Sequence, residues 1–178
     1  MLIELRIAGT GGQGSVMAGQ LFAAAAVKQG LFATQSQFYG SEIQGGPAVA
    51  DVRISDEPVM FPWVTAPDIL VALHQNALDA HLKYLKPDGT LIYDPLFVTR
   101  LPEKGGRTVH AVRLAEMADG LGRRVVANVI AVAVVARLSG LLTQDSVRAV
   151  VDERIARGKE LNQKAVATGY ALSIGATA

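Results

Sequence analysis

A glycine-rich turn near the start of the chain constrains the fold more than any other sequence feature. The apolar run Leu2 to Ala8 breaks at Gly9-Thr10-Gly11-Gly12-Gln13-Gly14, and Ser15 then opens an alanine-rich stretch that ends at Lys28. This order predicts a strand, a tight turn and a helix. Gly30 stops the helix, and Leu31 to Phe38 is predicted as a second strand, parallel to the first and reached by a right-handed crossover. The chain thus opens with a predicted βαβ unit.

The middle of the chain predicts a second unit of this kind. Pro47 to Ser55 alternates small apolar and polar residues, which indicates a half-exposed strand at or near a sheet edge. Ile69 to Leu73 is a short continuous apolar run that suits a buried parallel strand. Asn76 is the predicted cap of a helix that ends near Lys86, and a strand over Thr90 to Tyr93 completes the unit.

The last third of the chain is predicted to be helical after one more strand at Thr108 to Val112. We expect a single domain over residues 1–178 with an α/β fold: an open, mostly parallel sheet with flanking helices, a Rossmann-like opening unit and a helical C-terminal third. The predicted C-terminal helices are Leu114 to Asp119, Val125 to Leu138, Thr143 to Arg157 and Glu160 to Leu172.

Composition excludes several classes of function. The 178 residues carry 17 basic and 16 acidic side chains, a balance that offers no electrostatic surface for nucleic acid or for an anionic membrane. The chain has no cysteine, so disulfides, catalytic thiols and cysteine-ligated iron–sulfur clusters are excluded within it. The apolar run Val125 to Ala136 is too short to cross a bilayer. The first apolar run contains Glu4 and Arg6 and then becomes glycine-rich, which is not the pattern of a secretory signal peptide. We therefore expect a cytoplasmic protein.

The glycine turn leaves three interpretations open. Gly9, Gly11 and Gly14 satisfy G-x-G-x-x-G between a predicted strand and helix, where backbone N–H groups and the helix dipole favour an anion. A dinucleotide site also requires an acidic residue near the end of the second strand, and Ala33 to Phe38 contains none. An NAD(P)-dependent oxidoreductase is therefore one alternative. The others are binding of a different polar or phosphate ligand, and close packing at a subunit contact in a purely architectural protein.

Other candidate residues carry weaker signals. His74, His81 and His110 lack metal-ligand spacing, and we interpret them as satisfied or exposed histidines. Asp68 and Asp94 are predicted at strand ends, where α/β proteins place their chemistry, although both also suit turns and caps. We assign no catalytic residue and no metal ligand.

Several sequence blocks together resemble the gamma subunit, or gamma domain, of the 2-oxoacid:ferredoxin (acceptor) oxidoreductases, a family with pyruvate, ketoisovalerate, indolepyruvate and arylglyoxylate types. The similarity runs in order from about Ile3 to Leu172, which makes it far more specific than the glycine turn alone. The blocks are Gly9 to Gly14 with Ala18-Gly19, Tyr39 to Gly46, Val52 to Pro58, Pro67 to Leu73, Leu85 to Ile92, Asn128, and Leu161 to Ala165 with Gly169-Tyr170.

The resemblance implies an accessory gamma subunit of a multisubunit enzyme that converts a 2-oxoacid and coenzyme A (CoA) to acyl-CoA and CO₂. Thiamine diphosphate and iron–sulfur clusters are then expected on alpha-like, beta-like and ferredoxin-like (delta) partner subunits, and this chain alone binds no cofactor. Contact with CoA stays open, as do the 2-oxoacid and the electron acceptor, ferredoxin or NAD. The candidate ligand-binding residues are Gly11, Gly12, Gln13, Gly14, Ser15, Tyr39, Glu42, Gln44, Gly45 and Gly46.

Two positions depart from the family pattern. Gln44 stands where the family commonly has arginine, which removes a fixed cation, and Ala131-Val132 replaces a common Leu-Gly pair. We also expect obligate association with partners, because the helices Val125 to Leu138 and Met17 to Val27 offer more apolar surface than a small sheet covers.

Overall fold

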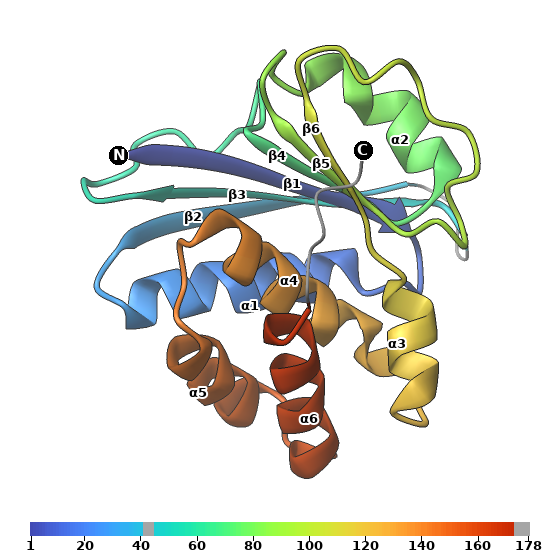
Figure 1. Cartoon of the computed structure of the whole chain (residues 1–178). Coiled ribbons are helices and arrows are strands. Elements are labelled where there is room, and N and C mark those ends of the chain that lie inside the picture. Colours follow the sequence, from blue (N-terminus) through green and yellow to red (C-terminus); the bar gives the residue numbers. More distant parts are fainter. Residues whose placement is uncertain (41–44, 173–178) are drawn as a thin grey trace.

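A single six-stranded sheet organises the computed structural model, which describes residues 1–40 and 45–172 (Figure 1). The strands lie in the order β2-β3-β1-β4-β5-β6, and only β3 runs against the other five. The predicted mostly parallel α/β sheet is confirmed. The strands are β1 (Leu2–Thr10), β2 (Phe32–Tyr39), β3 (Pro47–Ser55), β4 (Ile69–Ala72), β5 (Thr90–Tyr93) and β6 (Thr108–Ala111).

The opening unit differs from a Rossmann unit in one respect. β2 has the predicted direction, but β3 lies between β1 and β2 and pairs antiparallel with both. Pro47 to Ser55 lies near a sheet edge, as predicted, with only β2 outside it, but the strand is largely buried and not half-exposed. The alternation itself is correct, since Ala50, Val52 and Ile54 are buried on one face. The polar residues of the other face are covered in the fold, which a local pattern does not reveal.

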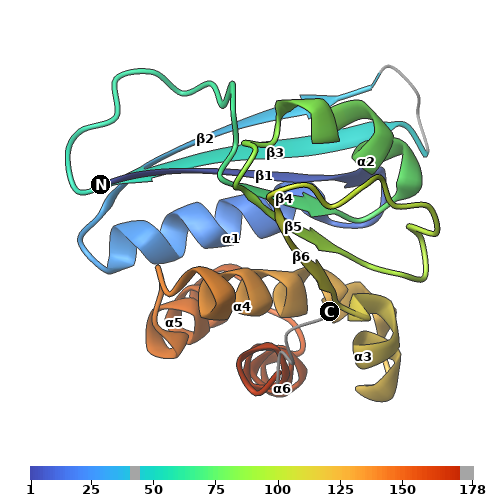
Figure 2. The same cartoon turned by 45° about the horizontal axis from the view of Figure 1, so that its top comes forward.

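Helices cover the two faces of the sheet unequally (Figures 1 and 2). The helices α1, α4, α5 and α6 lie on one side, and the short helix α2 lies on the other. The bounds are α1 (Ser15–Lys28), α2 (Gln75–His81), α3 (Leu114–Gly120), α4 (Ala127–Ser139), α5 (Gln144–Arg154) and α6 (Lys159–Tyr170), with 3₁₀ turns η1 (Leu82–Tyr84) and η2 (Arg124–Val126). The predicted C-terminal helices are confirmed to within a few residues at each end.

The apolar helix α4 is buried inside this chain. Its residues Val129 to Ala136 are at most 1% exposed, packed among α1, α3, α5 and α6. Gly169 permits this packing, because a Cβ there would lie 2.5 Å from the Ala133 Cβ. The expectation that α4 leaves apolar surface for a partner is therefore wrong, since four helices of the same chain cover it.

The second predicted βαβ unit, β4-α2-β5, is present with adjacent parallel strands. Its helix is shorter than expected, and His74 rather than Asn76 caps it, with the His74 Nδ1 accepting from the Asn76 amide at 3.2 Å. Asp68 precedes β4, so it lies at the amino end of the sheet. There its carboxylate binds Lys86 at 2.5 Å and the Glu4 amide at 2.8 Å. Asp68 and Asp94 therefore lie at opposite ends of the parallel strands, and only Asp94 lies at the carboxyl ends, where α/β proteins place their chemistry.

A buried ion pair ties two central strands on the face opposite α1. The Arg6 guanidinium binds Asp51 through two 2.7 Å hydrogen bonds and donates a third, of 2.8 Å, to the Val64 carbonyl. These contacts fasten the connection between β3 and β4 over the sheet. No helix within residues 1–40 and 45–172 has the length and apolar character required to span a membrane.

Candidate functional site

The glycine loop lies at the carboxyl end of β1 and leads directly into α1. Gly14 is the residue before the helix, with φ 77°, and Gly12 has φ 96°, so both adopt the left-handed conformation that glycine tolerates best. Gly12 is exposed, and no acceptor within the described residues binds the amides of Gly12 and Gly14. The loop therefore offers free N–H donors at the positive end of the 14-residue helix α1.

Gln13 fixes the shape of this loop with its side chain. Its Oε1 accepts from the Thr10 amide at 2.8 Å, and its Nε2 donates to the Leu73 carbonyl at 2.8 Å. The same amide group thus joins the ends of β1 and β4. Gly9 leaves room for it, because a Cβ there would lie 2.7 Å from the Gln13 Oε1. The side-chain amide of Gln13 therefore stabilises the loop through contacts within the chain.

The second predicted block meets the glycine loop through backbone contacts. The Gly11 amide donates to the Gly46 carbonyl at 2.8 Å, which brings the two loops together as expected. Gly45 is exposed with φ 76°, and Tyr39 is 57% exposed at the end of the edge strand β2. Glu42 and Gln44 lie outside the described residues.

Ser15 performs a structural task in this arrangement. Its hydroxyl is buried and donates to the Ala48 carbonyl of β3 at 2.8 Å. A hydroxyl with this partner anchors the first turn of α1 to the sheet. For Ser15, only the backbone amide therefore remains a candidate for ligand binding.

A cavity of about 360 Å³ adjoins the glycine loop. Gly12, Gln13 and Gly14 form one wall, and the connection after β5, the start of α3 and the start of α4 form the others. Its remaining lining residues are Leu73, Asp94, Phe97, Leu114, Ala115, Arg124, Val125, Ala127 and Asn128. The cavity is of the size that holds part of a small-molecule ligand.

Asn128 faces the glycine loop across this cavity. A Cβ on Gly14 would lie 2.7 Å from the Asn128 Nδ2 and 2.9 Å from its Cβ, so only glycine lets α4 approach this closely. The Asn128 Oδ1 accepts from the Val129 amide at 2.8 Å. Nδ2 lies against Gly14, and Asn128 also lines the cavity.

Asp94 follows β5 and is 2% exposed. Its two oxygens accept from the amides of Leu96 at 3.0 Å and Ala115 at 2.8 Å. These donors satisfy the buried carboxylate and fasten the start of α3 to the end of β5. Asp94 shapes the wall, and its negative charge opposes an anion placed deep in the cavity.

Arg124 supplies a cation at this site that the sequence reasoning missed. It begins the turn before α4, and its guanidinium donates to both oxygens of Asp119, from Nε at 3.0 Å and from Nη2. The hydrogen bond to Asp119 raises the pKa of Arg124, so the guanidinium stays charged. The sequence gives little indication that Arg124 belongs to the site, because Arg124 lies far along the chain from the glycine loop. Only the fold brings the two to one cavity.

The topology argues against a dinucleotide site. In a Rossmann unit the second strand lies beside the first, and its end carries the acidic residue that binds the ribose. Here β3 occupies that place, and the residues next to the end of β1 are Pro47 and Ala48. Neither carries a hydrogen-bonding side chain. The described residues at this position therefore lack the group that an NAD site requires.

Comparison with known proteins gives a consistent assignment. The family model described as pyruvate ferredoxin/flavodoxin oxidoreductase matches residues 4–172. The chain is 35% identical over 164 residues to the 2-oxoglutarate synthase subunit KorC of Methanothermobacter marburgensis, covering 88% of each chain. It is 32% identical over 155 residues to the pyruvate synthase subunit PorC of the same organism, covering 85% of this chain and 86% of that one.

One solved structure is similar to this chain in both sequence and fold. The crystal structure of the keto/oxoacid ferredoxin oxidoreductase gamma subunit from Geobacter sulfurreducens is 35% identical to this chain, with a TM-score of 0.82. The match covers 94% of this chain and 96% of that subunit.

Proposed function

The chain belongs to the pyruvate ferredoxin/flavodoxin oxidoreductase family, and from this premise we propose that it is the gamma-type subunit of a multisubunit 2-oxoacid:acceptor oxidoreductase. The enzyme converts a 2-oxoacid and CoA to acyl-CoA and CO₂ and passes the electrons to an acceptor. Alpha-like, beta-like and ferredoxin-like subunits carry the thiamine diphosphate and the iron–sulfur clusters. This chain shapes the path of CoA to that centre.

The observation that carries the proposal is the cavity beside the glycine loop. The free amides of Gly12 and Gly14 and the Arg124 guanidinium are suited to a phosphate, because all of them donate hydrogen bonds and none accepts. Phe97 and Leu114 offer an apolar wall for an alkyl chain. CoA combines these groups, with phosphates at one end and a pantetheine arm at the other.

The residues act by binding and orientation. The amides of the loop and Arg124 hold the anionic end, and Asn128 donates to an amide carbonyl of the arm. The buried carboxylate of Asp94 keeps the phosphates toward the glycine loop and Arg124, because like charges repel. No proton transfer is assigned to this chain. The chemical steps take place on the partner subunits.

The kinetic test uses the assembled complex with substitutions in this subunit. Gly12→Asp places a carboxylate beside the loop amides, and Arg124→Gln removes the cation. Each is expected to raise the apparent KM for CoA about 10-fold or more, since charge-assisted hydrogen bonds contribute about 1.5 to 3 kcal/mol. The CoA-independent reaction of the 2-oxoacid is expected to stay within about twofold of the original rate.

Matched controls separate binding from folding. Gly30→Asp introduces the same side chain at φ 83° at the far end of α1, where nothing lies within 4 Å of a new Cβ. Arg123→Gln removes an exposed arginine adjacent to Arg124 that does not line the cavity. If the test variants assemble and show the same KM for CoA as these controls, the loop is architectural and the CoA assignment is wrong.

A further inference from the structure

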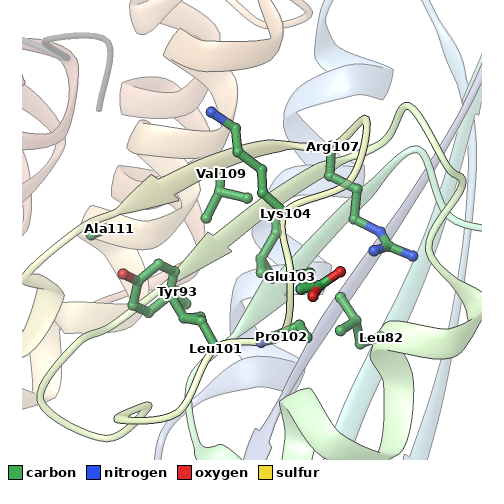
Figure 3. Close-up of a pocket in the computed structure, with 10 residues that line it drawn as sticks. Leu82, Tyr93, Leu101, Pro102, Glu103, Lys104, Arg107, Val109 and Ala111 are labelled. Carbon is green, nitrogen blue, oxygen red and sulfur yellow. The ribbon is translucent and has the colours of Figure 1, made fainter. Parts of the chain in front are cut away.

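A second cavity, of about 210 Å³, lies on the opposite face of the sheet from α1, over β5 and β6. Figure 3 shows it between the two strands and the segment that connects them. Leu82, Leu91, Leu101 and Val109 contribute apolar side chains, and Tyr93 closes one side. None of these residues lines the cavity at the glycine loop, so the two sites are separate.

The charged residues of this cavity are arranged for an anion. Lys104 and Arg107 line it together with one carboxylate, Glu103. The Arg107 Nε is buried, and it has no hydrogen-bond partner among the described residues. A buried donor on a permanently charged guanidinium is costly to leave unpaired, which indicates that an acceptor belongs beside it.

The backbone around Arg107 is built tightly enough to preform the site. The Arg107 amide donates to the Lys104 carbonyl at 3.2 Å and closes a turn in which Gly105 has φ 56°. A Cβ on Gly106 would lie 3.1 Å from the Pro87 carbonyl oxygen, so glycine lets this turn pack against the start of β5. The turn therefore sets both cations at the rim before any ligand arrives.

We propose that this cavity binds a small carboxylic acid, with the carboxylate on the Arg107 guanidinium and a short aliphatic or aromatic body against Leu91 and Val109. The volume is below the range of about 300 to 1,000 Å³ that holds drug-sized ligands, so a body of a few carbon atoms is the match. Glu103 lies at the exposed rim on the side of Arg107 and disfavours ligands with a second carboxylate near that end (Figure 3). The site thus selects a monocarboxylate.

The test is a calorimetric titration of the full chain with hexanoate and, separately, with hexanamide, which has the same body and no charge. We expect hexanoate to bind at least about 10-fold more tightly than the amide, because the charge-assisted bond is present only with the acid. Titration with 2-oxohexanoate identifies the source of the ligand: tighter binding than hexanoate indicates a 2-oxoacid, and equal binding indicates a simple acid.

Substitutions locate the site. Arg107→Ala is expected to remove the preference for hexanoate over hexanamide, and Ala111→Trp is expected to abolish binding of both by filling the cavity from β6. Arg148→Ala removes the same charge from an exposed position on α5 and is expected to leave both affinities unchanged. Equal affinity of the unsubstituted chain for acid and amide, or unchanged hexanoate binding in Arg107→Ala, would overturn the proposal. Both results are independent of the CoA assignment, which is measured in the assembled complex.

Discussion

The Gln13 side chain joins the ends of two neighbouring parallel strands, since its Nε2 donates to the Leu73 carbonyl at 2.8 Å while its Oε1 accepts from the Thr10 amide. These two hydrogen bonds fix the position of the glycine loop relative to the ends of β1 and β4. Gln13→Met keeps the length of the side chain and removes its hydrogen bonds. We expect the free energy of unfolding to fall by about 1 to 3 kcal/mol, measured by urea denaturation. Gln37→Met, at an exposed position on β2, is the control and is expected to change it by less than about 0.5 kcal/mol.

The contact of Gly14 with Asn128 predicts an energetic coupling between the loop and α4. Gly14→Ala places a Cβ against the Asn128 side chain and also strains a positive φ, whereas Gly30→Ala introduces only the strain. We expect Gly14→Ala to be the more destabilising of the two by about 1 to 3 kcal/mol, because the site is overpacked. Adding Asn128→Gly, which removes the Asn128 Cβ as well as its amide, should recover part of that difference in urea denaturation, relative to Asn128→Gly alone. An additive double variant would contradict the contact.

The Arg6–Asp51 pair predicts a large penalty for removing one partner alone. Arg6→Met leaves the Asp51 carboxylate without its cation in a largely buried position, which is expected to cost about 3 to 5 kcal/mol of unfolding free energy. Arg6→Met with Asp51→Leu removes both charges and is expected to restore most of the loss. Lys164→Met, which breaks an exposed pair with Glu160, serves as the comparison and should cost less than about 1 kcal/mol. Equal losses in the two single variants would refute this account.

His81 predicts a dependence of stability on pH. Burial lowers the pKa of His81 from its ordinary value of 6.5, and the nearby Arg6 lowers it further. Below pH 6.5 the unfolded chain therefore binds more protons than the folded chain, so the free energy of unfolding falls as the pH drops. His81→Gln should reduce this dependence between about pH 7 and about pH 5 in urea titrations. A pH profile identical to that of the unsubstituted chain would contradict this role.

The sequence predicts most elements of the fold because their signals are local. The glycine turn, the apolar run of β4 and the Thr143 cap of α5 each lie within a few residues of the structure they determine. The order of the strands in the sheet, by contrast, does not follow from local signals. The alternation of apolar and polar residues in β3 indicates that one face of the strand is buried under α1. It does not indicate that Asp51 and Arg53 on the other face form ion pairs and are covered.

The candidate site was predictable in its backbone and not in its side chains. Gly11 and Gly46 meet as the two sequence blocks indicate. Arg124 joins the cavity only because α3 folds back toward the glycine loop, a relation between distant segments that no local pattern carries. Ser15 is a candidate ligand-binding residue in the sequence, but no local pattern shows that its hydroxyl donates to the Ala48 carbonyl of β3.

The antiparallel strand β3 also determines the order in which this edge of the sheet unfolds locally. β2 pairs with β3 and has no ladder to β1, so its hydrogen bonds to the rest of the sheet all pass through β3. Opening of this edge therefore proceeds from β2 through β3, and β1, which stays paired with β4, opens last among these three strands. Amide hydrogen exchange across the sheet should follow the spatial order of the strands, not their order along the chain.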